Sequence, residues 1–217
     1  MIESIVLFPD DVDLSADLAE ALWRSGRVDE AEKIATSVLK KSSQHPMARG
    51  TLAKIFEHNG LEAQKLEQWG RAIAAFERAL AMKPQNRELG RNMALLLYNF
   101  RLKSKFLPQA ASRKDMDRAL ILFTEAQGGV GDSAEALETQ IGIAVHSSQP
   151  KAAVAPCVRL QKEFGGSKNM VSLLDCAEAF KLDGQKEKAH QLLFEALNKE
   201  SFKSQRPQLD AALRGLE

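Results

Sequence analysis

The chain has 217 residues, of which 44 % are hydrophobic and 27 % are charged, with a formal net charge of +1. This composition is that of a globular protein and excludes a wholly disordered chain. A net charge so close to zero gives no general attraction to nucleic acid or to an anionic membrane surface.

The beginning of the chain and its cysteines predict where the protein resides. Residues 1–8 are mostly apolar, but they include Glu3 and lack a basic flank, so they do not resemble a signal peptide. No apolar run reaches the roughly 18 residues that a membrane-spanning helix needs, and we expect no membrane insertion. Cys157 and Cys176 are too few for a disulfide framework. Both fall on core-facing positions of successive repeats and are candidate neighbours in space, but we favour two buried thiols that act as small hydrophobic residues. We predict a cytoplasmic location.

A pair of helical patterns opens the chain and recurs along it. The first pattern carries Leu18, Ala19 and Leu22 and leads to Gly26. The second begins with a small residue, followed by core residues four and seven positions later and by a turn residue after twelve. This spacing places three side chains on one helix face before a stop signal. Copies of the second pattern begin at Ala31, Ala72, Ala119, Ala153 and Ala189. The repeated unit is therefore an antiparallel helix pair of about 34 residues.

Three stretches resemble the tetratricopeptide repeat (TPR) family: ALWRSGRVDEAEKIATSVL, AIAAFERALAMKPQN and CAEAFKLDGQKEKAHQLLFEAL. The resemblance covers roughly residues 12–203 and implies an all-α fold, a right-handed superhelical solenoid of antiparallel helix pairs. We predict a single TPR-like domain over residues 1–217. Its repeats are expected at about 12–45, 46–86, 87–133, 134–167 and 170–203, with a C-terminal cap at 204–217.

Two insertions lengthen the second and third repeats. The first, LEAQKLEQ after Gly60, is made of good helix formers and predicts a helical extension, with Gly60 expected to end the preceding helix. The second, residues 101–118, contains Pro108 and predicts a protruding basic arm. Its candidate contact residues are Arg101, Lys103, Lys105, Arg113 and Lys114. The arm either contacts an acidic partner, phosphate or nucleic acid, or is a solvated helix extension and turn.

Motifs of catalysis and metal binding are missing from the sequence. The four histidines are far apart, and no Cys-x2-Cys or His-x3-His spacing occurs. The glycine-rich GGVGDS at 128–133 follows a helical pattern and lacks the Gly-Lys-Ser/Thr of a phosphate-binding loop. We therefore predict no enzymatic activity, no metal and no cofactor.

The concave face of such a solenoid is lined by the first helix of each pair. The helical period places these candidate partner-binding residues there: Trp23, Arg24, Lys54, His58, Arg91, Tyr98 and Asn99. Trp23 and Tyr98 are the expected anchors, because each combines a large ring with a hydrogen-bonding group, although either ring could instead pack between helices.

This lining predicts a non-catalytic protein–protein interaction scaffold that binds a peptide or a partner helix in its concave groove. One alternative is a regulatory or oligomerising repeat domain of a larger enzyme or assembly machine. A second is polyanion or nucleic-acid contact through the basic arm, although the balanced charge disfavours nucleic acid. A homodimer through the solenoid ends is also expected, since residues 5–7 are apolar.

Overall fold

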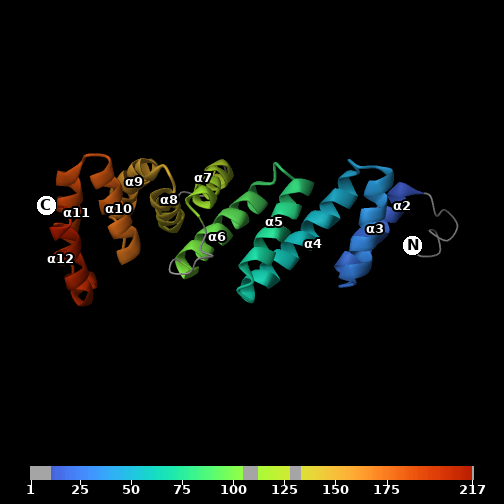
Figure 1. Cartoon of the computed structure of the whole chain (residues 1–217), viewed down its shortest axis with the longest axis horizontal. Helices are drawn as coiled ribbons and strands as arrows, with labels where there is room; N and C mark the ends of the chain where they lie inside the picture. Colours follow the sequence, from blue (N-terminus) through green and yellow to red (C-terminus); the bar gives the residue numbers. More distant parts are fainter. Residues whose placement is uncertain (1–10, 105–111, 128–132, 217) are drawn as a thin grey trace. The chain divides into compact units, whose positions relative to one another are not determined.

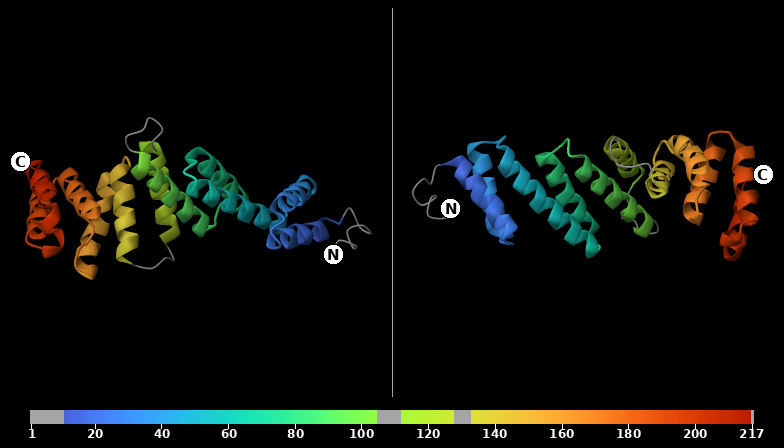
Figure 2. Two further views of the ribbon diagram at one scale, coloured as in Figure 1. Left: turned by 90° about the horizontal axis from the view of Figure 1, so that it is seen from below. Right: turned by 180° about the vertical axis from the view of Figure 1, so that it is seen from behind.

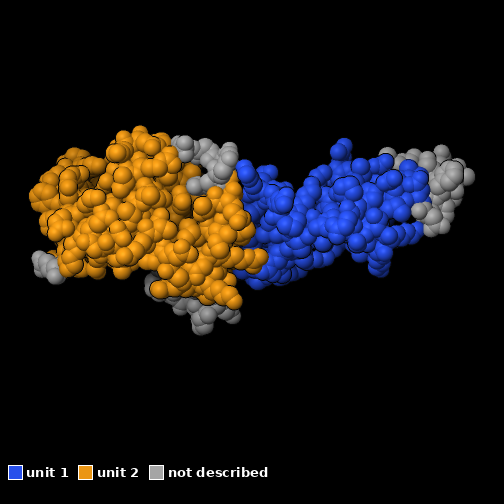
Figure 3. Space-filling view, turned by 90° about the horizontal axis from the view of Figure 1, so that it is seen from above, with its two compact units in different colours: residues 1–96 blue, residues 97–217 orange. Residues whose placement is uncertain are grey.

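The computed structural model describes residues 11–104, 112–127 and 133–216, and these parts are helical without any strand (Figure 1). The chain divides into two compact units, residues 1–96 and 97–217 (Figure 3). The boundary between them falls within helix α6 (Arg87–Ser104). Each unit is built from helix pairs that follow one another in chain order, which is the predicted all-α repeat fold (Figure 2). The prediction that the two units form a single domain stays a prediction.

Unit 1 contains two complete helix pairs and the first part of α6. The pairs are α2 (Val12–Arg24) with α3 (Val28–Lys41), and α4 (Pro46–Lys65) with α5 (Trp69–Met82), followed by α6 (Arg87–Ser104). Asp11 begins α2 by accepting a hydrogen bond from the backbone N–H of Leu14, which satisfies one of the unpaired donors at the helix start. Gly26, with φ of +80°, turns the chain from α2 into α3.

The recurring small and large residues form the core of unit 1. Ala31, Ala35 and Val38 of α3 are buried, as are Ala72 and Phe76 of α5. Alanines at these positions allow neighbouring helices to approach closely, while the larger residues fill the space between them. The periodic pattern therefore identified the buried faces correctly.

The first insertion extends helix α4, as predicted, because α4 continues to Lys65. The expectation that Gly60 ends the helix is wrong, since Gly60 lies inside α4. A Cβ at this position would be 2.7 Å from ring atoms of Phe76, so glycine here permits the close packing of α4 on α5. The left-handed turn residue between these helices is Glu67, with φ of 55°.

Unit 2 contains the end of α6 and the remaining elements. They are α7 (Arg113–Gln127), α8 (Ala134–His146), the 3-10 helix η1 (Pro150–Ala153), α9 (Val154–Phe164), α10 (Met170–Leu182), α11 (Lys186–Leu197), the 3-10 helix η2 (Glu200–Gln205) and α12 (Arg206–Arg214). In the second half of the fourth repeat, α9 begins only at Val154, directly after η1. Pro156 therefore falls in the first turn of α9, where a missing backbone N–H is tolerated. The helix α12 packs on α11 and buries Leu209.

The two cysteines correct a prediction. Cys157 of α9 and Cys176 of α10 form a disulfide with 5.7 Å between their Cα atoms, so they are not free thiols. Both occupy core positions, as expected, but the sequence did not show that the two helices bring these positions into bonding distance.

The basic arm lies partly outside the described residues. Lys105 belongs to the undescribed range 105–111, as does Pro108. Arg101 and Lys103 are in the last turn of α6, whereas Arg113 and Lys114 are exposed at the start of α7. Most of the glycine-rich stretch 128–133 is also outside the described part. Across the parts that are described, no helix combines the length and the apolar character needed to cross a membrane.

Candidate functional site

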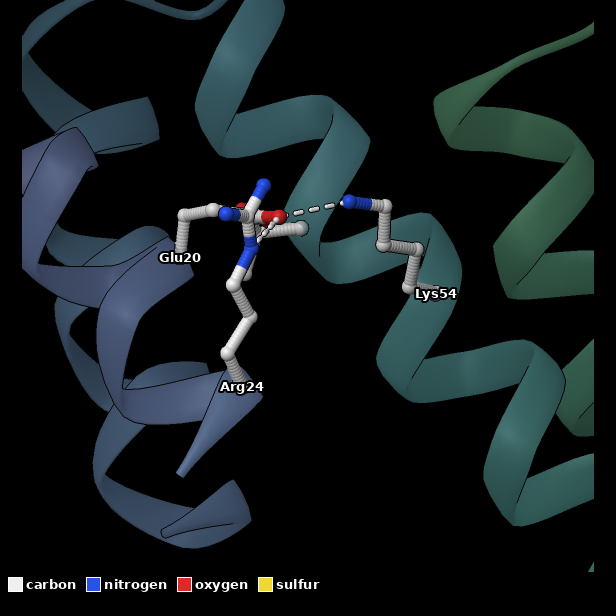
Figure 4. Close-up of polar contacts among 4 residues, drawn as sticks. Glu20, Arg24 and Lys54 are labelled. Carbon is white, nitrogen blue, oxygen red and sulfur yellow. Dashed lines mark hydrogen bonds and ion pairs between the residues drawn. The ribbon is translucent and has the colours of Figure 1, made fainter. Parts of the chain in front are cut away.

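A hydrogen-bond network centred on Glu20 joins α2 to α4 on one face of unit 1 (Figure 4). The Glu20 carboxylate accepts bonds from Lys54 Nζ at 2.7 Å and from Thr51 Oγ1 at 2.9 Å, both on α4. It also accepts a bond from Arg24 Nε at 3.0 Å, one turn further along α2. The Glu20 side chain is only 14 % exposed, whereas Arg24 and Lys54 are 74 % and 47 % exposed. The network therefore has a shielded carboxylate at its centre and two cationic groups that face solvent.

The ionisation of Glu20 reflects two opposing effects. Burial is the largest single influence and raises the pKa of Glu20, but the hydrogen bonds from Lys54, Thr51 and Arg24 together outweigh it, so the pKa is lowered. Glu20 is consequently an anion at neutral pH. Its charge attracts the two cationic groups.

An aromatic contact lies beside this network on the same two helices. The rings of Trp23 and His58 meet edge to face with centroids 5.6 Å apart. Trp23 is half-buried and packs against the core of unit 1, while His58 is exposed. On the other side of α4, the Asn92 amide of α6 donates a 2.9 Å bond to the Glu57 carboxylate. Side-chain contacts thus connect the first helices of three successive repeats, and we call this surface the first-helix face of unit 1.

The corresponding helices of unit 2 are α8, α10 and the end of α6. Tyr98 of α6 packs against α8 at Gly142, where a Cβ would overlap the Tyr98 hydroxyl oxygen. Burial, together with the negative charges of Asp175 and Glu138, raises the pKa of Tyr98 to about 12. The tyrosine therefore remains a neutral hydroxyl wedged between helices, which is one of the two placements that the sequence left open.

Asp175 of α10 has a carboxylate that is not fully hydrogen-bonded among the described residues. One of its carboxylate oxygens, Oδ2, is buried without a hydrogen-bond partner in the described part of the chain. Burial raises the pKa of Asp175 to about 6. Glu138 on α8, by contrast, accepts a hydrogen bond from the Ser167 hydroxyl.

The predicted partner-binding residues fall into two groups. Trp23, Arg24, Lys54 and His58 come together on the first-helix face of unit 1. Arg91 is exposed on the unit 1 part of α6, while Tyr98 and Asn99 are half-buried in the part of α6 that belongs to unit 2. Their roles in partner binding stay predictions.

The helical period also places Glu20 and Glu57 on this face, but it does not show which side chains they contact. Glu20 accepts bonds from Thr51 and Lys54, and Glu57 accepts one from Asn92. These partners lie about one repeat away, at separations of 31, 34 and 35 residues. Complementary side chains one repeat apart are therefore the signal that could have identified them. No group of three potential metal ligands occurs within the described ranges.

Comparison with known proteins agrees with this architecture. A family model described as "Tetratricopeptide repeat" matches residues 6–55. The fold is similar to that of YrrB, whose structure is described as "a TPR protein with an unusual peptide-binding site", with 13 % identity and a TM-score of 0.54 over 94 % of this chain and 97 % of that one.

Two further solved structures resemble the chain more loosely. TTC0263 of Thermus thermophilus, described as a thermophilic TPR protein, is 16 % identical over 93 % of this chain and 98 % of its own, with a TM-score of 0.46. MamA of Desulfovibrio magneticus is 14 % identical over 92 % and 97 %, with a TM-score of 0.49. None of the curated proteins matches the sequence. The start of the chain thus matches the tetratricopeptide repeat family model, and the fold of the chain is similar to that of a TPR protein.

Proposed function

We propose that the protein is a non-catalytic interaction protein that binds a peptide or a partner helix on the first-helix face of unit 1. The observation that carries this proposal is the Glu20 network with its neighbouring aromatic pair. Lys54 and Arg24 each use only part of their donor capacity on Glu20, because an ammonium group has three N–H donors and a guanidinium has five. The remaining donors can bind backbone carbonyls or carboxylates of a partner.

The same arrangement reduces the cost of binding. Long cationic side chains lose conformational freedom when a partner immobilises them. Glu20 already restrains Lys54 and Arg24 in the free protein, so less freedom remains to be lost. The Trp23 and His58 rings add an amphipathic surface of the kind that dominates binding energy at protein interfaces. The peptide-binding site described for YrrB supports the view that this fold can accept a peptide.

The proposal is tested with peptides selected from a random display library on the immobilised full chain. Selected peptides are then titrated against the wild type and an Arg24→Ala/Lys54→Ala variant by fluorescence anisotropy. We expect binding at least about tenfold weaker in the variant. The matched control, Lys33→Ala/Lys40→Ala, removes two exposed cations from α3 and should bind like the wild type. Peptides that bind all three proteins equally would show that this face is not the binding site.

The other functional predictions remain open to separate tests. Oligomerisation through the ends, a role within a larger assembly and polyanion contact through the arm stay predictions. The Cys157–Cys176 disulfide is an observation against the predicted cytoplasmic location, because disulfides persist mainly in oxidising compartments. Cell fractionation with alkylation of free thiols before lysis would decide between the two locations.

A further inference from the structure

A groove on unit 2 has features that the proposed function does not use. It is a hollow of about 400 Å³ formed by α9, α10 and α11, on residues distinct from the first-helix face of unit 1. Leu173 and Phe180 of α10 form its buried apolar floor. Half-buried Val158 of α9 and Leu192 of α11 supply apolar walls. Its volume is within the range of about 300–1,000 Å³ that is usual for ligand sites.

The rim of this groove is cationic. Three exposed lysines line it, Lys162, Lys188 and Lys199, and none of them forms a salt bridge with any residue in the described ranges. Glu195 is the one acidic residue among the described residues that line the groove, and it accepts a hydrogen bond from Gln191 at 2.8 Å. The rim therefore carries a local excess of positive charge, although the whole chain has a net charge of only +1.

The disulfide fixes the shape of the groove. Cys157 precedes the wall residue Val158, and Cys176 lies on α10 between the floor residues Leu173 and Phe180. The covalent bond thus ties the α9 wall to the α10 floor. A groove that is formed before a partner arrives loses little conformational entropy on binding.

We propose that this lysine-rimmed groove docks an acidic segment of a partner protein. A large apolar side chain of the segment packs between the half-buried walls, Val158 and Leu192, above the floor, and flanking carboxylates pair with the three lysines. The choice of occupant follows from charge complementarity, since cations without a salt bridge around an apolar floor attract anions and repel basic segments. A small inorganic anion would leave the half-buried walls of the groove, Val158 and Leu192, in contact with water, so a peptide with both features fits better.

The probe is a fluorescein-labelled peptide, EELEFEEL, titrated into the full-length oxidised protein and followed by anisotropy. Two peptides of equal length separate the contributions: KKLKFKKL reverses the charge, and EESESEES removes the apolar side chains. We expect the acidic apolar peptide to bind at least about tenfold more tightly than either. Equal binding of EESESEES would overturn the proposal, because it would show nonspecific attraction to lysines.

Protein variants locate the binding. Lys162→Glu/Lys188→Glu/Lys199→Glu should weaken binding of EELEFEEL by at least about tenfold. The control, Lys33→Glu/Lys40→Glu/Lys83→Glu, changes the total charge equally on exposed lysines elsewhere and should retain binding. If both variants lose binding equally, total charge is responsible and the groove is not the site. A second rim variant, Lys162→Gln/Lys188→Gln/Lys199→Gln, removes the three charges without reversing them, and circular dichroism checks that each variant is folded. Retention of binding by a folded rim variant would also overturn the proposal.

Discussion

Single residues decide how closely helices approach in both units. Gly60 lies beneath the Phe76 ring, and Gly142 lies beneath the Tyr98 hydroxyl, so that any side chain at either position would collide with a ring. Neither contact involves an unusual backbone conformation, because neither glycine has a positive φ. Their importance comes from the missing Cβ and not from turn geometry.

Gly60→Ala should destabilise the protein by about 2 kcal/mol or more, because the new Cβ would overlap a fully buried ring and force the core to shift. Urea unfolding followed by circular dichroism measures the change. Gly70→Ala is the matched control, since a Cβ at Gly70 in α5 meets nothing within 4 Å. That change should be neutral or stabilising, by up to about 1 kcal/mol. Equal effects of the two substitutions would show that the Phe76 contact is unimportant.

Asp175 should make stability depend on pH. Its folded-state pKa of about 6 is above the ordinary value of 3.8, so protonation favours the folded state. This stabilisation is fully present below about pH 3.8 and is lost as the pH rises through about 6. Asp175→Asn should therefore gain about 1–3 kcal/mol relative to the wild type between about pH 4 and pH 7.5. Parallel pH profiles of the two proteins in urea unfolding would contradict this assignment.

Whole helices in unit 1 are held in register by polar contacts as well as by the core. The Glu20 network joins α2 to α4, and the Glu57–Asn92 bond joins α4 to α6. Buried or shielded hydrogen bonds to a charged group are stronger than exposed ion pairs. The contacts therefore contribute to the packing of successive repeats and position the proposed binding surface at the same time.

Glu20→Gln should cost about 1–2 kcal/mol of unfolding free energy, because three donors lose an ionised acceptor that is only 14 % exposed. Thermal unfolding monitored by circular dichroism gives the difference. The comparison variant is Glu30→Gln, which breaks an exposed ion pair with Arg27. Exposed pairs contribute little, so no measurable change is expected there. A loss in the Glu30 variant equal to that in the Glu20 variant would show that burial is irrelevant to the network.

At the scale of the whole molecule, repeats contact mainly their neighbours in sequence, so stability is expected to be local. The disulfide is confined to unit 2, where it closes a loop between residues separated by 19 positions. In unit 1, the described part of the chain relies on noncovalent packing. Loss of the disulfide should therefore affect the two units differently.

Cys157→Ser/Cys176→Ser should destabilise unit 2 by about 3 kcal/mol, the usual effect for a closed loop of this length. Hydrogen exchange with mass spectrometry should show reduced protection in α9, α10 and α11, with little change in α2 to α5. The same pattern is expected when the wild type is treated with a thiol reductant. Equal loss of protection in both units would contradict local stability. Free thiols in the untreated protein would contradict the disulfide itself.

The sequence by itself determined the helical repeat, the buried face of each helix and the extension of α4. These features depend on residues a few positions apart, whose spacing along one helix is known from helix geometry. It also identified four residues that share the first-helix face of unit 1, because equivalent positions of successive repeats lie on the same side.

Only the tertiary structure decided the Cys157–Cys176 bond, the Glu20 network, the placement of Tyr98 against Gly142 and the lysine-rimmed groove. Each of these features depends on the distance and the angle between two or more different helices. Helix packing angles vary with the side chains at the contact, so the spacing of residues along the chain does not specify which atoms meet.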